Sequence, residues 1–163
     1  MLLCSIHDER FASIAVTEAD RSQLPMKHGC VAVSSGKIIA RGCNTYRTFS
    51  KDKLIRNCCS CHAEIDVIRK CIKLNIKKKI KLYVVRVTEN GNYRNSAPCN
   101  MCLHILKEHN VHTIIYSTNE GTLQKHKLIE YNNIHKSGGQ KAIENKRVIF
   151  KKSGNYFVFK ETT

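Results

Sequence analysis

Two short motifs constrain the fold of this chain more than any other feature of its sequence. The first is Cys61-His62-Ala63-Glu64 and the second is Pro98-Cys99-Asn100-Met101-Cys102. Together they offer one imidazole, two thiols and one carboxylate, which are the ligand types that zinc prefers. If a helix begins at Pro98, Cys99 and Cys102 share one face with Cβ atoms about 5 to 6 Å apart, a spacing that suits two Zn–S bonds. The fold must therefore bring the two motifs together.

The residue types favour a catalytic zinc site over a structural one. His62, Cys99 and Cys102 supply three protein ligands, and the fourth tetrahedral position stays open for water. If His62 lies at the entry of a helix, where the backbone is not yet helical, Glu64 can point at that position and move protons there. The alternative is a fourth ligand from a neighbouring cysteine, in which case the metal would only stabilise the fold.

The motifs resemble the signature of the zinc-dependent nucleobase deaminases, H-x-E followed by P-C-x-x-C. This superfamily includes cytidine and deoxycytidylate deaminases, tRNA adenosine deaminases and polynucleotide cytidine deaminases. The resemblance covers roughly residues 28–118 and implies a three-layer α/β fold with a mixed central sheet of about five strands flanked by helices. It also implies Zn²⁺ as the cofactor and Glu64 as the catalytic proton shuttle, with attack at C4 of cytosine or C6 of adenine.

Length and net charge limit the domain organisation and the kinds of partner that we expect. Its 163 residues fit a single domain spanning residues 1–163, and Lys plus Arg number 28 against 13 acidic residues, a formal net charge of +15. This excess attracts anionic nucleotides and polynucleotides, although a compositional bias toward lysine would also produce it. The expected partners are a pyrimidine nucleoside or nucleotide, single-stranded nucleic acid or tRNA, and relatives in the superfamily commonly form homo-oligomers.

Hydropathy and cysteine usage favour a protein inside the cell, cytoplasmic or nuclear, and not in a membrane. No apolar run approaches the roughly 18 residues that span a bilayer, and the first eight residues are too short and too soon acidic for a signal peptide. In a reducing compartment nine cysteines indicate metal ligands or buried thiols. Cys58, Cys59 and Cys61 leave a second metal site open, but packed thiols are favoured because no further ligand stands at suitable spacing.

Hydrophobic periodicity places the elements that carry the motifs. Apolar residues recurring at three and four predict helices, and β-branched runs between turn residues predict strands. Pro25 and Gly29 are expected to break the chain before the first strand. The predicted elements are helices over residues 8–19, 63–74 and 99–109, and strands over residues 30–33, 38–43, 80–87 and 112–118.

The pattern is weaker beyond residue 119. Residues 124–132 alternate in a way that favours the return strand of a hairpin over a helix. Ser137-Gly138-Gly139 predicts a loop. Residues 147–150 and 156–159, on either side of Ser153-Gly154-Asn155, predict an extra C-terminal β-hairpin.

Three candidates for substrate contacts lie in or near the predicted core. The resemblance implies that Asn44, which follows the second strand, hydrogen-bonds the sugar, and an Asx turn that closes the strand is the alternative. Ala63 is a candidate through its place inside the first motif. Arg86 interrupts an otherwise apolar strand, so we expect it at the end of the strand, near the site.

Two further candidates lie in residues 89–95, which form an insertion relative to tRNA adenosine deaminases. Tyr93 and Arg94 could stack on a base or meet a phosphate there, and a plain surface loop is the alternative. The leading prediction is a deaminase of a cytosine-type base. Its rivals are a tRNA-type adenosine deaminase and a non-catalytic, zinc-stabilised module that binds nucleic acid.

Overall fold

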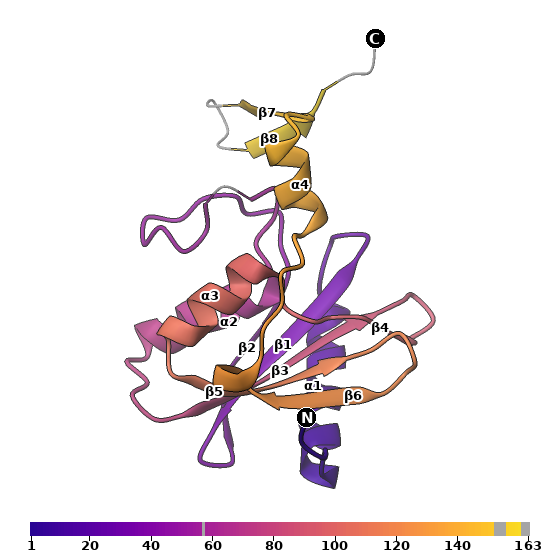
Figure 1. The fold of residues 1–163 in the computed structure, drawn as a ribbon, viewed down its shortest axis with the longest axis vertical. Helices are drawn as coiled ribbons and strands as arrows, with labels where there is room; N and C mark the ends of the chain where they lie inside the picture. Colours follow the sequence, from indigo (N-terminus) through magenta and orange to yellow (C-terminus); the bar gives the residue numbers. More distant parts are fainter. Residues whose placement is uncertain (57, 152–155, 161–163) are drawn as a thin grey trace.

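A computed structural model of the chain describes residues 1–56, 58–151 and 156–160, and its centre is a mixed sheet in the strand order β2-β1-β3-β5-β6 (Figure 1). β1 (Lys27–Ser34) pairs antiparallel with β2 (Lys37–Cys43) and with β3 (Ile80–Val87). β3 runs parallel to β5 (Val111–Ser117), and β6 (Leu123–Lys127) returns antiparallel to β5. The predicted mixed sheet is confirmed.

Helices cover both faces of this sheet, so the fold has the predicted three layers (Figure 1). α1 (Ile6–Ala19) packs on one face, and α2 (Ala63–Lys73) and α3 (Asn100–Glu108) pack on the other. Successive side chains of a strand point to opposite faces. In β3, Val84 accordingly joins the apolar cluster under α2 and α3, whereas Val85 joins the cluster under α1.

The approach of α1 to the sheet explains one glycine. A Cβ atom at Gly29 would lie 1.8 Å from the backbone oxygen of Ala15 and 2.5 Å from the backbone nitrogen of Ala19. Only glycine therefore lets helix and strand come this close. The prediction that Gly29 breaks the chain before the first strand is wrong, because Gly29 lies within β1.

The insertion before Pro98 belongs to the sheet. β4 (Tyr93–Arg94) pairs antiparallel with Arg86 and Val87 at the end of β3. The ladder between β3 and β5 ends at Val84, and beyond this point Ser96 is held by both strands. Its backbone nitrogen donates to the Ser117 oxygen at 3.0 Å, and its Oγ donates to the Val84 oxygen at 2.7 Å. The insertion thus wedges the carboxyl ends of two parallel strands apart, where α/β sheets form ligand crevices.

The C-terminal part differs from the sequence prediction in two places. The return strand ends at Lys127, and the next residues form the 3₁₀ helix η1 (Leu128–Glu130). The loop predicted at residues 137–139 is the start of helix α4 (Gly138–Glu144), where Ser137 Oγ accepts a hydrogen bond from Gln140 N at 3.1 Å. Two glycines are poor helix formers, so the cap was the remaining indication of this helix.

The last element is the predicted C-terminal hairpin, in which β7 (Val148–Lys151) pairs antiparallel with β8 (Tyr156–Phe159). Figure 1 shows it beyond α4, away from the central sheet. The predicted turn at residues 153–155 lies outside the described residues. In the described part of the chain, every helix is too short or too polar to cross a membrane.

Candidate active site

Both metal-binding motifs lie at helix starts. His62 precedes α2 with φ −72° and ψ 151°, so the predicted non-helical backbone at this residue is confirmed. Cys99 precedes α3 with φ −67° and ψ 166°, and this helix begins at Asn100, one residue inside the predicted range 99–109. Neither His62 nor Cys99 caps its own helix through its side chain. The imidazole and the thiol are therefore available for other contacts.

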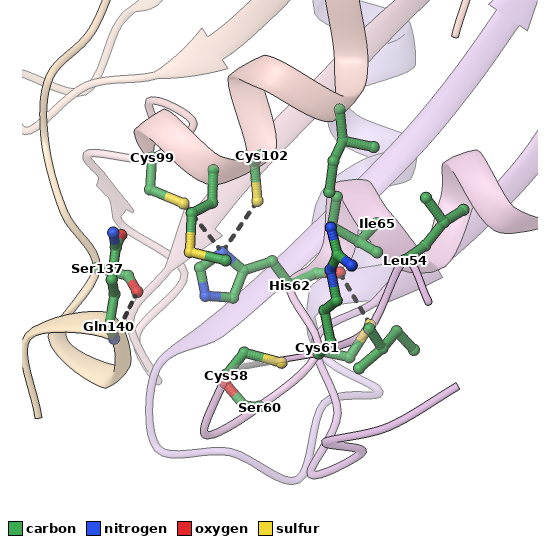
Figure 2. A pocket seen from close by; sticks show the side chains of 14 residues that line it. Leu54, Cys58, Ser60, Cys61, His62, Ile65, Cys99, Cys102, Ser137 and Gln140 are labelled. Atoms are coloured by element: carbon green, nitrogen blue, oxygen red, sulfur yellow. Dashed lines mark hydrogen bonds between the residues drawn. The ribbon is translucent and has the colours of Figure 1, made fainter. Parts of the chain in front are cut away.

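The side chains of His62, Cys99 and Cys102 converge (Figure 2). His62 Nδ1 lies 3.2 Å from Cys102 Sγ and 3.6 Å from Cys99 Sγ, and all three ligand atoms lie within 4.8 Å of one another. Zn–N bonds of about 2.0 Å and Zn–S bonds of about 2.3 Å in a tetrahedron separate the ligand atoms by about 3.5 Å. The three residues therefore fit Zn²⁺. Within the described residues, no fourth His, Cys, Asp or Glu joins this cluster.

Hydrogen bonds within the cluster set its protonation. Pairing with Cys102 and with His62 outweighs burial and lowers the pKa of Cys99 to about 4. The same pairing, together with burial, raises the pKa of Cys102 well above its ordinary value. Burial acts to lower the pKa of His62, but the hydrogen bond with Cys99 and the charge of Glu64 raise it to about 9. A cation that binds here replaces the protons on His62 and Cys102.

Glu64, the second residue of α2, lies beside the cluster and is only 4% exposed. Burial raises the pKa of its carboxyl group, while the charge of His62 acts in the opposite direction. A carboxyl group whose charged form is destabilised by burial accepts a proton more readily than an exposed one. Glu64 thus has the properties of a group that exchanges protons with a bound molecule.

The cluster lies between two hollows. The first, which we call the polar cavity, has a volume of about 1220 Å³ with open solvent included, and Glu64 lines it. The second is an apolar pocket of about 400 Å³, and Figure 2 shows His62 and the two cysteines above its loop residues. His62 and Cys99 line both hollows. Besides the motif residues, the polar cavity is lined by Leu24, Met26, His28, Asn44, Ser60, Arg86, residues 95–97, Asn119, His135 and residues 137–139.

Asn44 lines the polar cavity, but its side chain also holds the sheet together. Its Oδ1 accepts from His28 N at 3.0 Å and its Nδ2 donates to Met26 O at 2.6 Å, so it joins the end of β2 to the start of β1. This role is structural, but it is a contact between strands and not the local Asx turn that was the alternative. The amide oxygen and nitrogen each keep capacity for one further hydrogen bond. The sugar contact therefore stays a prediction.

Of the other four substrate candidates, only Arg86 lines the polar cavity. Ala63 is fully buried in the core under α2 and α3. Tyr93 lies opposite Val87 in the β3–β4 register and packs in the cluster under α1, on the face of the sheet away from the metal ligands. Arg94 lies opposite Arg86 and lines a separate hollow. The structure does not bring Ala63, Tyr93 or Arg94 into the cavity.

The three cysteines before α2 lie near the cluster without joining it. Cys61 Sγ donates to the backbone oxygen of His62 at 3.4 Å, and Cys59 Sγ donates to that of Gly139 at 3.6 Å. Burial raises the pKa of Cys58 to about 11 and that of Cys61 to about 12. Within the described residues, they form no second group of three metal ligands. The contacts agree with the prediction of packed thiols.

Sequence reasoning missed several cavity residues. His28 lies opposite Arg86 on β1, its Nδ1 donates to Met26 O at 3.3 Å, and burial lowers its pKa to about 4. A histidine at the start of an apolar strand was the available indication. His135 and residues 137–139 reach the cavity from far along the chain and carry no motif, so only the fold reveals them.

The fold and the ligand cluster are those of the zinc-dependent nucleobase deaminases. A family model described as "Cytidine and deoxycytidylate deaminase zinc-binding region" matches residues 5–118. The chain belongs to this family. No curated protein sequence matched it.

Solved structures share the fold at low sequence identity. The chain is similar to cytidine deaminase from Burkholderia pseudomallei, with a TM-score of 0.56 and 16% identity over 77% of this chain and 94% of that chain. For cytidine deaminase from Mycobacterium leprae the TM-score is 0.52, with 19% identity over 74% and 94%. For dCMP deaminase from the cyanophage S-TIM5 in complex with dCMP and dUMP the TM-score is 0.50, with 19% identity over 71% and 83%. These similarities concern the fold alone.

Proposed function

We propose that this protein is a zinc-dependent hydrolytic deaminase that converts a cytosine-type base to uracil and releases ammonia. One observation carries the proposal: a buried carboxyl group with a raised pKa, Glu64, lines the same cavity as the metal ligands His62 and Cys99. A zinc ion that only stabilises the fold needs no such neighbour. Membership in a family of cytidine and deoxycytidylate deaminases supports the same reaction.

Different residues of the chain bind the metal, transfer protons and bind the sugar in the proposed reaction. His62, Cys99 and Cys102 would hold the metal, which would supply an activated water molecule at neutral pH when bound. Glu64 takes up a proton in the cavity as the water is consumed and delivers protons to the ring nitrogen and to the departing ammonia. Burial raises the pKa of Glu64, which favours the uptake of a proton. Asn44 has hydrogen-bonding capacity left for the sugar.

The test is ammonia release by zinc-loaded protein from cytidine, deoxycytidine, their monophosphates, adenosine, single-stranded DNA and tRNA. Glu64→Gln keeps the shape of the side chain but cannot carry the proton. We therefore expect this variant to retain zinc and to turn over about 10²- to 10⁴-fold more slowly than the wild type. Asp66→Asn is the matched control, because Asp66 lies on the same helix and pairs with Lys70 at 2.8 Å. We expect it to keep wild-type turnover.

Two results count against the proposal. If Glu64→Gln retains both zinc and turnover, Glu64 is not the proton shuttle. If the zinc-loaded wild type releases ammonia from none of these substrates, the chain is better described as a zinc-stabilised binding module. If only adenosine or tRNA is turned over, the substrate base is adenine and not cytosine. The site accommodates either assignment because both bases present the same amino-amidine edge.

A further inference from the structure

Arg86 brings a charge without a partner into the polar cavity. Its side chain lies on the α2 and α3 face of the sheet, because Val84, two residues earlier in the same strand, packs on that face. Within the described part of the chain, its guanidinium group makes no salt bridge, and the contact of Arg86 with the Ser117 side chain uses the backbone nitrogen of Arg86, not the guanidinium. A half-buried guanidinium without a carboxylate is best satisfied by an anionic ligand.

The backbone that carries Arg86 is held from three sides. His28 on β1 and Arg94 on β4 are its partners across the two neighbouring strands. Arg86 N donates to Ser117 Oγ at 3.0 Å, and the same hydroxyl donates to Arg94 O at 2.7 Å. The position from which the guanidinium reaches into the cavity is therefore fixed before a ligand arrives, which lowers the entropic cost of binding.

The surroundings of Arg86 suit an anion. The one carboxylate among the described lining residues is Glu64, and it forms no salt bridge with Arg86. The amide side chains of Asn95 and Asn119 line the same cavity and can donate hydrogen bonds. The nearest further arginine in the sheet, Arg94, lines a separate hollow. The cavity thus offers one guanidinium, which matches one phosphate group.

We propose that Arg86 binds the phosphate of the substrate, and that this protein selects free nucleotide 5′-monophosphates over nucleosides. This inference rests on the proposed function, since it names the substrate class of the same site. A phosphomonoester and the phosphodiester of a polynucleotide share the chemistry that Arg86 recognises. The free nucleotide is favoured because Arg94, the next cation along the sheet, lies outside the cavity, where a second phosphate would need a partner.

The experiment compares kcat/KM of the zinc-loaded full chain for CMP, dCMP, cytidine, deoxycytidine and a short single-stranded oligonucleotide. We expect the monophosphates to be preferred by at least about tenfold. Arg86→Ala removes a charge-assisted contact, which corresponds to a loss of about 10- to 100-fold for the monophosphates and no change for the nucleosides. Arg86→Lys keeps the charge without the planar fork and recovers part of the loss.

Arg94→Ala is the matched control, because it removes the same charge from the neighbouring strand. We expect it to leave both substrate classes unchanged. A second readout is calorimetric binding of the products dUMP and deoxyuridine, which requires no turnover. Arg86→Ala should weaken binding of dUMP by a similar factor and leave binding of deoxyuridine as it is. A melting curve for each variant confirms that it is folded.

The outcomes separate this inference from the proposed function. Equal losses for nucleotide and nucleoside in Arg86→Ala overturn phosphate recognition, even if deamination is observed. If kcat/KM is higher for the oligonucleotide than for dCMP, and both Arg86→Ala and Arg94→Ala lower it, the substrate is a polynucleotide and not a free nucleotide. Arg86-dependent binding of dUMP without deamination of any substrate supports the phosphate site and overturns the proposed reaction.

Discussion

The two faces of the central sheet bury carboxyl groups in opposite ways. Under α1, Asp8 is 2% exposed and accepts hydrogen bonds from Lys125 Nζ at 2.7 Å and from Tyr83 OH at 2.8 Å. These bonds and those from Ser5 outweigh the effect of burial and lower the pKa of Asp8 to about 2. On the other face, Glu64 is similarly buried, has no salt bridge among the described residues, and its pKa is raised by that burial.

This difference teaches how to recognise a functional carboxylate. Burial alone does not mark one, because Asp8 is as buried as Glu64 and serves the fold. At Glu64 burial outweighs the nearby charge of His62 and the hydrogen bonds that it accepts, so the carboxylate charge is only partly compensated within the protein. Arg86 is less buried, but its charge also has no salt-bridge partner among the described residues.

The largest expected effect breaks the metal cluster itself. Cys102→Ala removes one of three ligand atoms, so we expect bound zinc and turnover to be lost together. The measurements are metal content by elemental analysis and ammonia release. Cys61→Ala is the matched control, because Cys61 is also buried near the cluster but its Sγ hydrogen-bonds the His62 backbone oxygen. If Cys61→Ala loses zinc as well, the metal has a fourth protein ligand and the catalytic interpretation is wrong.

A smaller effect distinguishes the two carboxyl groups by stability. Asp8→Asn leaves Lys125 buried without its partner, so we expect a loss of about 3 kcal/mol in the free energy of unfolding by urea titration at neutral pH. Glu64→Gln removes a desolvated carboxyl group, and we expect an unfolding free energy equal to or above that of the wild type. If both variants lose the same amount, the contrast between the faces does not hold.

The lowered pKa of Asp8 also predicts how the stability of the fold changes in acid. The pKa of Asp8 in the folded state, about 2, lies below the value of about 3.9 in an unfolded chain. Its stabilising contribution is therefore complete above pH 4 and is lost as the pH falls from about 4 to about 2. In Asp8→Asn this part of the acid-induced loss of stability should disappear. Unchanged acid unfolding in that variant would mean that other groups control it.

The smallest effect compares the packing of the two faces through two glycines. Gly29→Ala places a Cβ atom against the backbone of α1, and we expect a loss of about 2 to 3 kcal/mol in unfolding free energy. In Gly42→Ala the new Cβ meets the end of the flexible Asp66 side chain at 2.0 Å, which can move, so we expect a loss below about 1 kcal/mol. Thermal or urea unfolding of both variants measures the difference. The reverse order would show that α2, and not α1, is the closely fitted layer.

The sequence predicted what depends on short spacing. His62, Cys99 and Cys102 stand within short motifs at the starts of two helices. Arg86 was expected near the site because a charge in an apolar strand favours the end of that strand. The sequence did not predict features that depend on the register between paired strands. Whether Tyr93 faces the cavity or α1 follows from its pairing with Val87, which no local pattern encodes.

The sequence also did not predict which residues far apart in the chain meet in the fold. Asn44 carries the same amide whether it serves the sheet or a sugar, and only the positions of Met26 and His28 show that the sheet already uses it. His135 and residues 137–139 border the cavity because the chain returns over the site after β6. Helix α4 was missed because its first turn holds two glycines.

The wedge between β3 and β5 has a consequence for how such a protein can diversify. Ser96 and Ser117 hydrogen-bond each other where this segment rejoins the sheet, while the metal ligands lie at the starts of two separate helices. Residues 89–95 can therefore be lengthened, shortened or exchanged as a cassette, and the reacting centre keeps its geometry. Asn95, the last residue of this segment, lines the polar cavity, so a change in the segment can alter the lining of the cavity while the metal ligands keep their places.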